Sequence, residues 1–581
     1  MKKNIVAHIV VFLLFFFLAA FITYPLIFHL GDLSTGTGDE LLIAWINKWI
    51  IHALTSQPSL LFEAPSFYPF QHSLAFSETF VTSSILFALP AFFVKEPIAF
   101  VNLDLIGSLV LLGFSCYLLA EYFVKDKFFS LLTGTMVVFS PVVLDKYVHL
   151  QVLLIFFVPL SYLFFFCFLR TKKTKFLIGS FICFVLQTYN SFLPGYFILF
   201  GIAIQLIFYI REKKGKIKWL LNIRYFIVII IAFALVIPFT LPYYSVSQAF
   251  NYKRDIRDAI HLSIQPGDLF YTYQFSRLAP LLSWLQHPET YPAAVSFKNG
   301  FPGLTLTILM IISVIVTIRS WRRSSYEKKA LFTIALTGLI LSFGPFLHIA
   351  RYTIHYPFPI PLPYAVLYYV VPGFNGMRNA ARWEMVFILA LSVVSVVTIQ
   401  ELTRSLSGKK KFMLLLVVFL FVIGEYKNTF HFVQIPSQQK FPQEYHWLNT
   451  IPNDAVVIEM PVYNWNTFPY ATDELRRQYF MTANFRRTVN GASGFSPPPW
   501  QELVTNLLLT FPEEQALNTL KKVGVNYIIL HMDDYDRLHK DNFQLSYGRA
   551  LSGEQVVGKL RKSKNVKEVK GFPKTKIFEL I

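Results

Sequence analysis

An acidic pair, Asp39 and Glu40, is the strongest chemical signal in the sequence. The pair follows GDLSTGTG (31–38), a glycine-rich stretch that ends an apolar run and lets a new helix begin. A carboxylate at this place could act as a general base and take the proton from a hydroxyl group. The alternative is structural: Asp39 would cap the helix, and Glu40 would be a first-turn acid favoured by the helix dipole.

The residues after the acidic pair predict a helix that lies along a membrane surface. From Leu41 onward apolar residues recur every three or four positions, and Trp45 and Trp49 are one turn apart. Tryptophan favours the boundary between water and lipid. The pattern therefore predicts an amphipathic surface helix that holds Asp39 and Glu40 at the depth of a lipid headgroup.

Further polar side chains are predicted on the same side of the membrane. Each lies on a loop or short hairpin between apolar segments, where a polar residue is often only part of a turn. Together they predict one outward-facing polar mouth. The candidates for lining it are His72, Glu78, Asp145, His149, Gln151, Tyr189 and Asn190.

Two arginines are candidates for binding an anion at the membrane surface. Arg378 and Arg382 lie four residues apart where a helix is expected to begin, so they could share one helix face. Their planar guanidinium groups suit bidentate contacts with phosphate. The alternative is that both side chains only extend to lipid headgroups. Asp104 lies inside an apolar segment, and an intramembrane acid is a functional candidate. The alternative is that Asp104 lies near the outer end of its segment and is solvated.

The composition places these residues in a polytopic membrane protein. Of 581 residues, 54% are hydrophobic and 15% are charged, against about 25% charged in soluble proteins. The net charge of +19 is concentrated in short clusters between apolar runs, and no nucleic-acid-binding motif is present. The composition therefore argues against a cytosolic enzyme, and a nucleic-acid-binding protein is excluded. The three cysteines all fall inside apolar runs, which excludes a disulfide framework and a zinc site.

Eleven apolar segments are predicted to cross the membrane. They lie near 5–30, 97–123, 128–144, 148–169, 176–190, 193–210, 219–242, 303–318, 330–347, 382–402 and 412–426. Basic loops such as 170–175, 211–218 and 319–329 are predicted to be cytoplasmic, because positive charge concentrates on that side. This places the N-terminus in the cytoplasm and the C-terminus outside. Two shorter stretches, 79–94 and 361–374, are predicted to be interfacial or re-entrant.

The chain changes character after residue 426. Residues 1–426 are predicted to form an all-α transmembrane bundle of about eleven spans, with outer loops at 31–96 and 243–302. Residues 427–581 alternate short β-like runs with a helix-like stretch, which predicts a soluble extracytoplasmic α/β domain.

The order of these features resembles the GT-C class of polytopic membrane glycosyltransferases, in particular an uncharacterised bacterial branch of it. The resemblance extends over nearly the whole chain. The matching segments are GDELLIAWINKW (38–49), FYPFQHSLAFSE (67–78), FSPVVLDKYVHLQ (139–151), FPGLTL (301–306), LSFGPFLHI (341–349), PLPYAVLYYVVPGFNGMRNAARW (361–383) and VNGASGFSPP (489–498).

The resemblance implies transfer of a sugar from a polyprenyl-phosphate donor to a surface glycan or lipid acceptor, with inversion, on the outer face of the bacterial cytoplasmic membrane. It implies that Asp39 is the catalytic base or helps to bind a divalent metal, with Glu40 as the neighbour that shares or replaces this role. Arg378 and Arg382 would hold the donor phosphate. The chain departs from the pattern at Lys298-Asn299-Gly300, where relatives tend to carry an acid.

Two other classes of function stay open. A transporter or flippase of lipid-linked sugars would have a similar number of spans, but it would need charges within the bundle and inverted repeats. Asp104 is the one clear intramembrane acid in the sequence, and no repeat is visible. The other class is a non-catalytic scaffold with an outer binding domain. Only the clustering of acids and arginines argues against it. No P-loop motif is present, so nothing indicates an ATP-driven pump.

Overall fold

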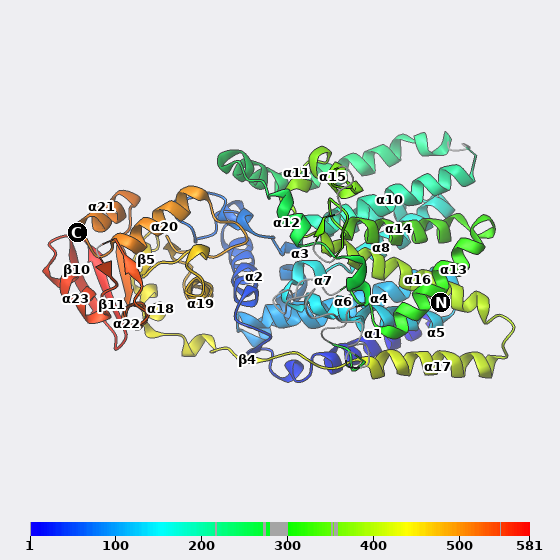
Figure 1. Ribbon diagram of the computed structural model, residues 1–581, viewed down its shortest axis with the longest axis horizontal. Coiled ribbons are helices and arrows are strands. Elements are labelled where there is room, and N and C mark those ends of the chain that lie inside the picture. Colours follow the sequence, from blue (N-terminus) through cyan, green and yellow to red (C-terminus); the bar gives the residue numbers. More distant parts are fainter. Residues whose placement is uncertain are drawn as a thin grey trace. The chain divides into compact units, whose positions relative to one another are not determined.

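The structure of the chain is a computed structural model. It describes residues 2–214, 218–270, 275–278, 280, 300–349, 352–353, 358–546 and 548–581. These residues form two compact units, which are described separately (Figure 1). The helical unit comprises Met1–Phe28, Asp104–Thr240 and Tyr252–His431. The sheet unit comprises His29–Leu103, Leu241–Asn251 and Phe432–Ile581.

Apolar helices, most of them long, make up most of the helical unit, and each of the eleven predicted spans contains at least one. They are α1 (Lys2–Ile22), α4 (Ile98–Val124), α5 (Lys127–Val138), α6 (Pro141–Leu144), α7 (Leu150–Leu153), α8 (Phe157–Thr171), α9 (Thr174–Thr188), α10 (Phe192–Glu212), α11 (Ile223–Phe250), α13 (Leu304–Arg319), α14 (Tyr326–Ser342), α16 (Glu384–Leu402) and α17 (Gly408–Glu425). A helix suits lipid because it satisfies its own backbone hydrogen bonds.

Six helical segments among the described residues are long and apolar enough to cross a membrane. They are Ile5–Ile22, Ile98–Val124, Leu150–Thr171, Phe192–Glu212, Ile223–Phe250 and Ala380–Leu402. A seventh is obtained if Lys127–Val138 and Pro141–Val148, which are bent by 50°, count as one span. The multi-pass membrane character is therefore confirmed, whereas the count of eleven spans stays a prediction.

The two stretches predicted to be interfacial or re-entrant are short helices. They are α3 (Val81–Val94) and α15 (Pro363–Val370), of 14 and 8 residues. At about 1.5 Å per residue neither crosses the roughly 30 Å of hydrocarbon in a bilayer. Apolar side chains such as Leu89 and Tyr369 are exposed on them. Their contact with the membrane interface stays a prediction.

A five-stranded mixed sheet is the centre of the sheet unit. Its strands are β5 (Val456–Met460), β6 (Arg487–Thr488), β7 (Tyr527–His531), β10 (Val566–Gly571) and β11 (Thr575–Leu580), in the order β10-β11-β7-β5-β6. β5 runs parallel to β6 and β7, whereas β11 is antiparallel to β7 and β10. The β-like runs of the sequence are thus real strands, and their extracytoplasmic location stays a prediction.

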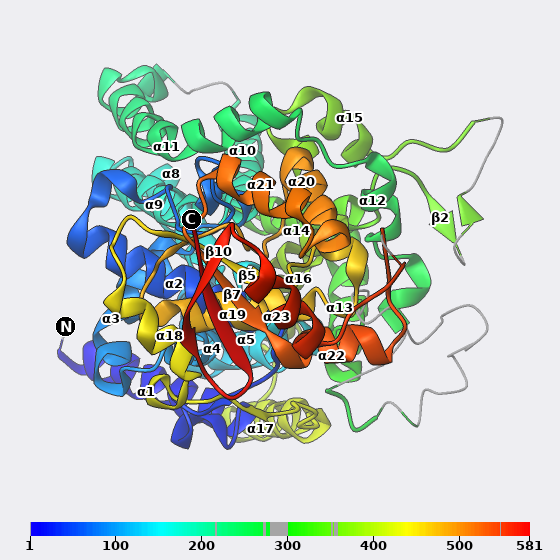
Figure 2. The same ribbon diagram turned by 90° about the vertical axis from the view of Figure 1, so that its left-hand side faces the viewer.

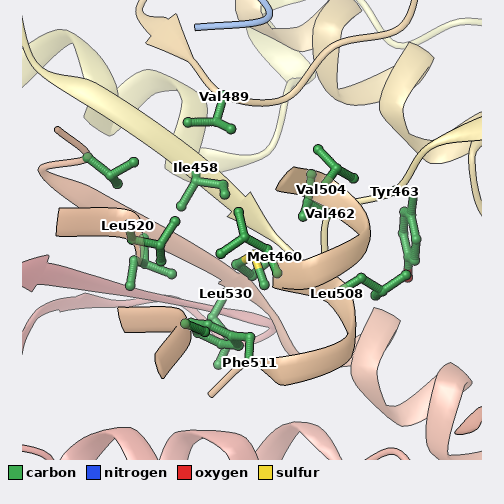
Figure 3. Close-up of a cluster of buried hydrophobic side chains, with 14 of the residues drawn as sticks. Ile458, Met460, Val462, Tyr463, Val489, Val504, Leu508, Phe511, Leu520 and Leu530 are labelled. Atoms are coloured by element: carbon green, nitrogen blue, oxygen red, sulfur yellow. The ribbon is translucent and has the colours of Figure 1, made fainter. Parts of the chain in front are cut away.

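Helices surround this sheet (Figure 2). They are α19 (Thr472–Phe480), α20 (Pro498–Thr510), α21 (Glu514–Val523), α22 (Met532–Lys540) and α23 (Gly553–Lys562). Ile458 and Met460 of β5 and Leu530 of β7 point toward Val504, Leu508 and Phe511 in the core between strands and helices (Figure 3). The alternation of apolar strands and amphipathic helices explains this core.

The first loop of the sequence is part of the sheet unit. β1 (Leu33–Ser34) pairs with β4 (Val433–Gln434), and the backbone N–H of Phe67 donates to the carbonyl of Asn490 at 3.0 Å. The ring of Phe67 packs against Trp500, with the ring centroids 4.7 Å apart. This grouping differs from the predicted division at residue 427. It depends on backbone pairing between segments that are far apart in the chain, and a local sequence pattern does not show such pairing.

Candidate functional site

The acidic pair lies at the start of α2 (Asp39–Ser56), and the structure gives its two carboxylates different surroundings. The side chain of Asp39 is exposed, whereas Glu40 is only 3% exposed. Gly38 occupies the N-cap position, so the expectation that Asp39 is the helix cap is wrong. Asp39 is instead the first residue of the helix, where the positive end of the helix dipole favours an anion.

Glu40 folds back onto the loop that precedes it. Its carboxylate accepts hydrogen bonds from Thr35 Oγ1 at 3.3 Å and from the backbone N–H of Gly38 at 3.2 Å. A Cβ atom at Gly36 would lie 2.7 Å from Glu40 Oε1, so a side chain there would displace the Glu40 carboxylate. Burial raises the pKa of Glu40, with a smaller contribution from the charge of Asp39. Glu40 therefore braces the loop.

The prediction that α2 is an amphipathic helix on the membrane surface is wrong in one respect. Trp45 and Trp49 are buried within the sheet unit. Trp49 Nε1 donates to the carbonyl of Leu61 at 2.9 Å, and its ring packs against Phe485. α2 packs on α19 and α3, which cover its apolar side chains. An apolar stripe looks the same in sequence whether protein or lipid covers it.

His72 and Glu78 also belong to the sheet unit, and both are half-buried. His72 Nδ1 lies 2.7 Å from Glu63 Oε1, and the backbone N–H of His72 donates to Glu63 Oε2 at 3.1 Å. His72 is therefore engaged by a carboxylate that the sequence analysis did not single out.

The helical unit buries a group of charged side chains around Lys146. Lys146 Nζ lies 2.7 Å from Glu384 Oε1 and 3.7 Å from Asp145 Oδ2. Lys146 is 4% exposed and Glu384 is 1% exposed. His149 lies within electrostatic range of Asp145, and Arg382 within range of Lys146. The structure thus brings together three of the predicted residues, Asp145, His149 and Arg382.

Lys146 and Glu384 were not among the predicted site residues. Glu384 is the first residue of α16, directly after the segment that carries the two arginines. An acid in an apolar span is a functional candidate by default, so Glu384 could have been predicted from the sequence. Its pairing with Lys146 was not available, because the two residues are far apart in the chain.

The prediction that Arg378 and Arg382 share one helix face is wrong. Asn379 has the extended conformation, with φ −110° and ψ 95°, and it interrupts any helix between the two arginines. Arg378 is exposed in an irregular segment before this residue, whereas Arg382 lies half-buried in the short turn η10 (Ala380–Trp383). The two guanidinium groups are therefore presented by different local structures.

The other candidates of the helical unit have separate surroundings. Tyr189 donates its hydroxyl to the carbonyl of Leu235 at 2.6 Å, and its ring stacks on Phe239 at 3.8 Å. Asn190 is buried beside it, and Gln151 is half-buried in α7. Asp104 is only 1% exposed within α4, so its interpretation as a solvated residue is wrong.

Acidic residues do lie next to the F-P-G segment, but they come from elsewhere in the chain. Lys298 and Asn299 lie outside the described residues. A Cβ atom at Gly300 would lie 3.3 Å from the backbone of Asp268, which is buried and within electrostatic range of Glu384. Asp268 is not among the residues predicted from the sequence, because a single acid in a long loop carries no periodic signal.

A protein metal site would need several carboxylates or imidazoles facing one point. Among the described residues, no group of three or more His, Cys, Asp or Glu side chains is arranged to hold a metal ion. The donor set around Asp39 therefore does not fit a metal held by protein ligands alone.

No protein family model matches this sequence, and no curated protein matches it either. Solved structures are similar to this chain to different degrees. The arabinofuranosyltransferase AftD from Mycobacteria has a TM-score of 0.56 at 13% identity, over 99% of this chain and 40% of AftD. An oligosaccharyltransferase from Archaeoglobus fulgidus has a TM-score of 0.49 at 12% identity, over 90% of this chain and 70% of that one.

A third similar structure is ArnT from Cupriavidus metallidurans, with a TM-score of 0.36 at 10% identity over 99% of this chain and 98% of ArnT. These neighbours are GT-C glycosyltransferases. This chain spans about 40% of the length of AftD, whose TM-score alone exceeds 0.5 among the three. The resemblance read from the sequence is thus confirmed at the level of the fold: the chain has the fold of the GT-C membrane glycosyltransferases.

Proposed function

We propose that the chain is a membrane glycosyltransferase that moves a sugar from a polyprenyl-phosphate donor to a surface glycan or lipid acceptor. The reaction would take place on the outer face of a bacterial cytoplasmic membrane. The GT-C fold and the multi-pass helices support this class of enzyme. The observation that carries the proposal is the exposed carboxylate of Asp39 at the first turn of α2, beside a buried and hydrogen-bonded Glu40.

In the proposed reaction an acceptor hydroxyl attacks the anomeric carbon of the donor sugar. Asp39 takes the proton of that hydroxyl as the new glycosidic bond forms. The bond between the anomeric carbon and the phosphate oxygen breaks, and its electron pair leaves with the polyprenyl phosphate. A phosphate leaves without protonation by a strong acid, so one carboxylate is enough, and attack from the opposite side inverts the anomeric centre.

The leaving phosphate gains charge in the transition state, and cations fixed nearby would stabilise it. Arg378 and Arg382 are proposed for this role, because a guanidinium can donate two hydrogen bonds to one phosphate. They act from different local structures, so each can be tested alone. Glu40 is proposed to position the loop before Asp39 rather than to replace Asp39 as the base, since its carboxylate is already engaged.

The remaining predicted residues are proposed to line the path of donor and acceptor: His72, Glu78, Asp145, His149, Gln151, Tyr189 and Asn190. Of these, Asp145 and His149 belong to the charged group around Lys146. The lipid bilayer supplies the donor, and the acceptor would come from the cell surface.

The experiment that tests this function uses the purified protein in lipid with a panel of radiolabelled undecaprenyl-phosphate sugars and cell-envelope acceptors. Release of undecaprenyl phosphate, with the label appearing in an acceptor, is the expected result. A flippase of lipid-linked sugars is the second candidate, favoured by the buried Asp104 in α4. Movement of the intact donor across vesicles, lost in Asp104→Asn and without phosphate release, would contradict the transferase and support the flippase.

A further inference from the structure

Three parallel strands bring the segments that follow them to one edge of the sheet unit. β5 pairs in parallel with β6 on one side and with β7 on the other. The chain passes from β5 to β6 and then returns to the opposite side of β5 as β7, so the strand order reverses at β5. In sheets of this kind ligands bind outside the carboxyl ends of the strands, where the order reverses. The segment after β5 is therefore a candidate binding segment.

This segment, residues 461–471, is called the aromatic loop because it exposes two aromatic side chains. Trp465 is 45% exposed and Phe468 is 70% exposed. The exposed large apolar side chains among the described residues of 432–581 are Val433, Trp465, Phe468 and Ile581. Exposed apolar side chains that lie close together mark an interaction site more often than scattered ones do. The two rings are therefore a candidate interaction surface.

Hydrogen bonds hold the aromatic loop in place. Trp465 begins the short turn η13 (Trp465–Thr467), and the preceding Asn464 joins this turn to α20, because its Nδ2 donates to Thr505 Oγ1 at 2.8 Å. The indole N–H of Trp465 donates to the carbonyl of Ser493, in the segment after β6, at 3.3 Å. The exposed part of the indole is thus mainly ring carbon. A fixed aromatic surface loses little conformational entropy when it binds a partner.

A sugar ring has the chemistry that fits this surface. Its C–H groups carry a small positive charge and pack on the electron-rich face of an aromatic ring. Its hydroxyl groups need hydrogen-bonding partners at the rim of the contact. The amide of Asn466, in the aromatic loop, and the hydroxyl of Thr472, directly after it, are both on exposed residues. Ring faces and polar rim groups therefore occur together here.

The charge of the aromatic loop distinguishes a sugar from a lipid surface. Segments that insert aromatic side chains into a membrane interface combine them with Lys or Arg, which bind anionic headgroups. The aromatic loop contains no charged residue. Arg537, which lies over the ring of Tyr470, is paired with Asp473. Arg477 is paired with Glu474 at 2.8 Å. The surface therefore favours an uncharged, hydroxyl-rich partner over an anionic membrane.

We propose that Trp465 and Phe468 form a binding site for an uncharged glycan, and that this glycan is the acceptor of the transferase. The assignment as acceptor rests on the proposed function and deepens it, since it selects a glycan over a lipid. The binding site itself does not depend on the transfer reaction. No step of that reaction is assigned to either aromatic residue.

The experiment measures binding of uncharged oligosaccharides by calorimetry. The full chain in lipid nanodiscs is titrated with linear hexasaccharides of glucose, galactose, mannose and N-acetylglucosamine, and wild type should bind at least one of them. Trp465→Ala and Phe468→Ala should each weaken this binding by about tenfold or more, as truncation of an aromatic anchor does. Phe468→Tyr keeps the ring and should keep the affinity. Phe468→Leu is apolar without an aromatic face and should lose it.

Phe93→Ala is the matched control. Phe93 is 75% exposed in α3, in the same unit but outside the aromatic loop, and its loss should leave the affinity at the wild-type value. The proposal would be overturned if wild type bound none of the hexasaccharides, if the alanine variants of the aromatic loop bound as wild type does, or if Phe93→Ala weakened binding equally. Nanodiscs with brominated lipids test the membrane instead. Quenching of the emission that Trp465→Phe removes would place this indole in lipid and also overturn the proposal.

Turnover separates the binding site from its assignment as the acceptor site. With a glycan acceptor, Trp465→Ala should raise KM for that acceptor by about tenfold and leave kcat unchanged, because the lost contact is the same in the ground state and the transition state. An active enzyme whose KM for the glycan does not change in Trp465→Ala would overturn the acceptor assignment alone. Glycan binding at the aromatic loop without any sugar transfer by wild type would overturn the proposed function and leave the binding site in place.

Discussion

Glu40 accepts a hydrogen bond from the backbone N–H of Gly38, with 3.2 Å between the nitrogen and Oε2. This contact turns the carboxylate of Glu40 into the loop and away from the exposed position that Asp39 occupies. Two adjacent acids with similar chemistry thus have different surroundings. In the proposed enzyme, the first of them meets the substrate and the second keeps the loop in place.

Glu40→Gln should flatten the pH dependence of stability. Burial raises the pKa of Glu40 above its usual value of 4.5, so the folded chain binds more protons there than the unfolded chain. Stability therefore falls as pH rises from 4.5 through the raised pKa, and then levels off. Thermal unfolding of wild type and variant in detergent across pH 4–8 measures this. Parallel profiles of the two proteins would contradict the expectation.

Glu474 should make the stability of the sheet unit depend on pH in a similar way, within a defined pH range. Its carboxylate accepts hydrogen bonds from Arg477 Nη1 at 2.8 Å, Asn490 Nδ2 at 2.9 Å and the backbone N–H of Tyr463 at 3.0 Å. Burial nevertheless raises the pKa of Glu474 from 4.5 to about 7. Stability should fall as pH rises between these values, by roughly 3 kcal/mol at most.

Hydrogen exchange of the β5 amides in the full chain, corrected for intrinsic rates, measures this effect. Glu474→Gln should remove the dependence between pH 4.5 and 7. The exposed Glu502 provides a control, since Glu502→Gln should keep the wild-type slope. A slope that persists in Glu474→Gln would show that another group causes it.

Glu425→Ala should destabilise the start of α13. The Glu425 carboxylate accepts hydrogen bonds from the backbone N–H of Leu304 at 2.7 Å and of Thr305 at 3.3 Å, as a capping side chain does. Loss of these acceptors should cost about 1–3 kcal/mol of unfolding free energy, because two half-buried donors lose their partner. Glu425→Gln keeps one acceptor and should cost less. Equal stability of the two variants would contradict the capping role.

Gly134→Ala should disturb the packing of three helices. A Cβ atom at Gly134 in α5 would lie 2.3 Å from the carbonyl oxygen of Gly113 in α4 and 2.4 Å from Cζ of Phe15 in α1. Backbone atoms cannot shift without a large energetic cost, so Gly134→Ala should lower the free energy of unfolding by about 1–3 kcal/mol. Gly558 in α23 has open space around it. Gly558→Ala should raise the free energy of unfolding by up to about 1 kcal/mol, because alanine favours a helix more than glycine does. The midpoints of thermal unfolding compare both changes. A midpoint for Gly134→Ala at or above the wild type would refute the close approach.

The helices of the fold could be predicted because their signal is local. A long apolar run forms a helix in lipid whatever surrounds it, so α1, α4 and α11 appear where the sequence places them. The burial of Trp45 and Trp49 could not be predicted in this way. Their stripe indicates that something apolar covers the helix, but only the fold shows that α19 and α3 cover it.

The candidate site, too, could be predicted from the sequence only where the signal is local. Asp145 and Arg382 stand out in sequence by charge type and position, and the structure brings them to the same group of charges. The link between them is the ion pair of Lys146 with Glu384, which depends on tertiary contact between distant segments. The shared helix face of Arg378 and Arg382 failed for a local reason, the extended conformation of Asn379, which propensity alone does not fix.

The central claim is that Asp39 is the catalytic base, and the rate of undecaprenyl phosphate release tests it most directly. Wild type, Asp39→Asn, Glu40→Gln and the surface control Glu502→Gln are compared in lipid with the donor and acceptor that the panel identifies. Asp39→Asn should lower the rate by about 10²- to 10⁴-fold while its unfolding midpoint stays at the wild-type value. Glu40→Gln should lose less, and Glu502→Gln nothing. Release by a folded Asp39→Asn at the wild-type rate would contradict the account.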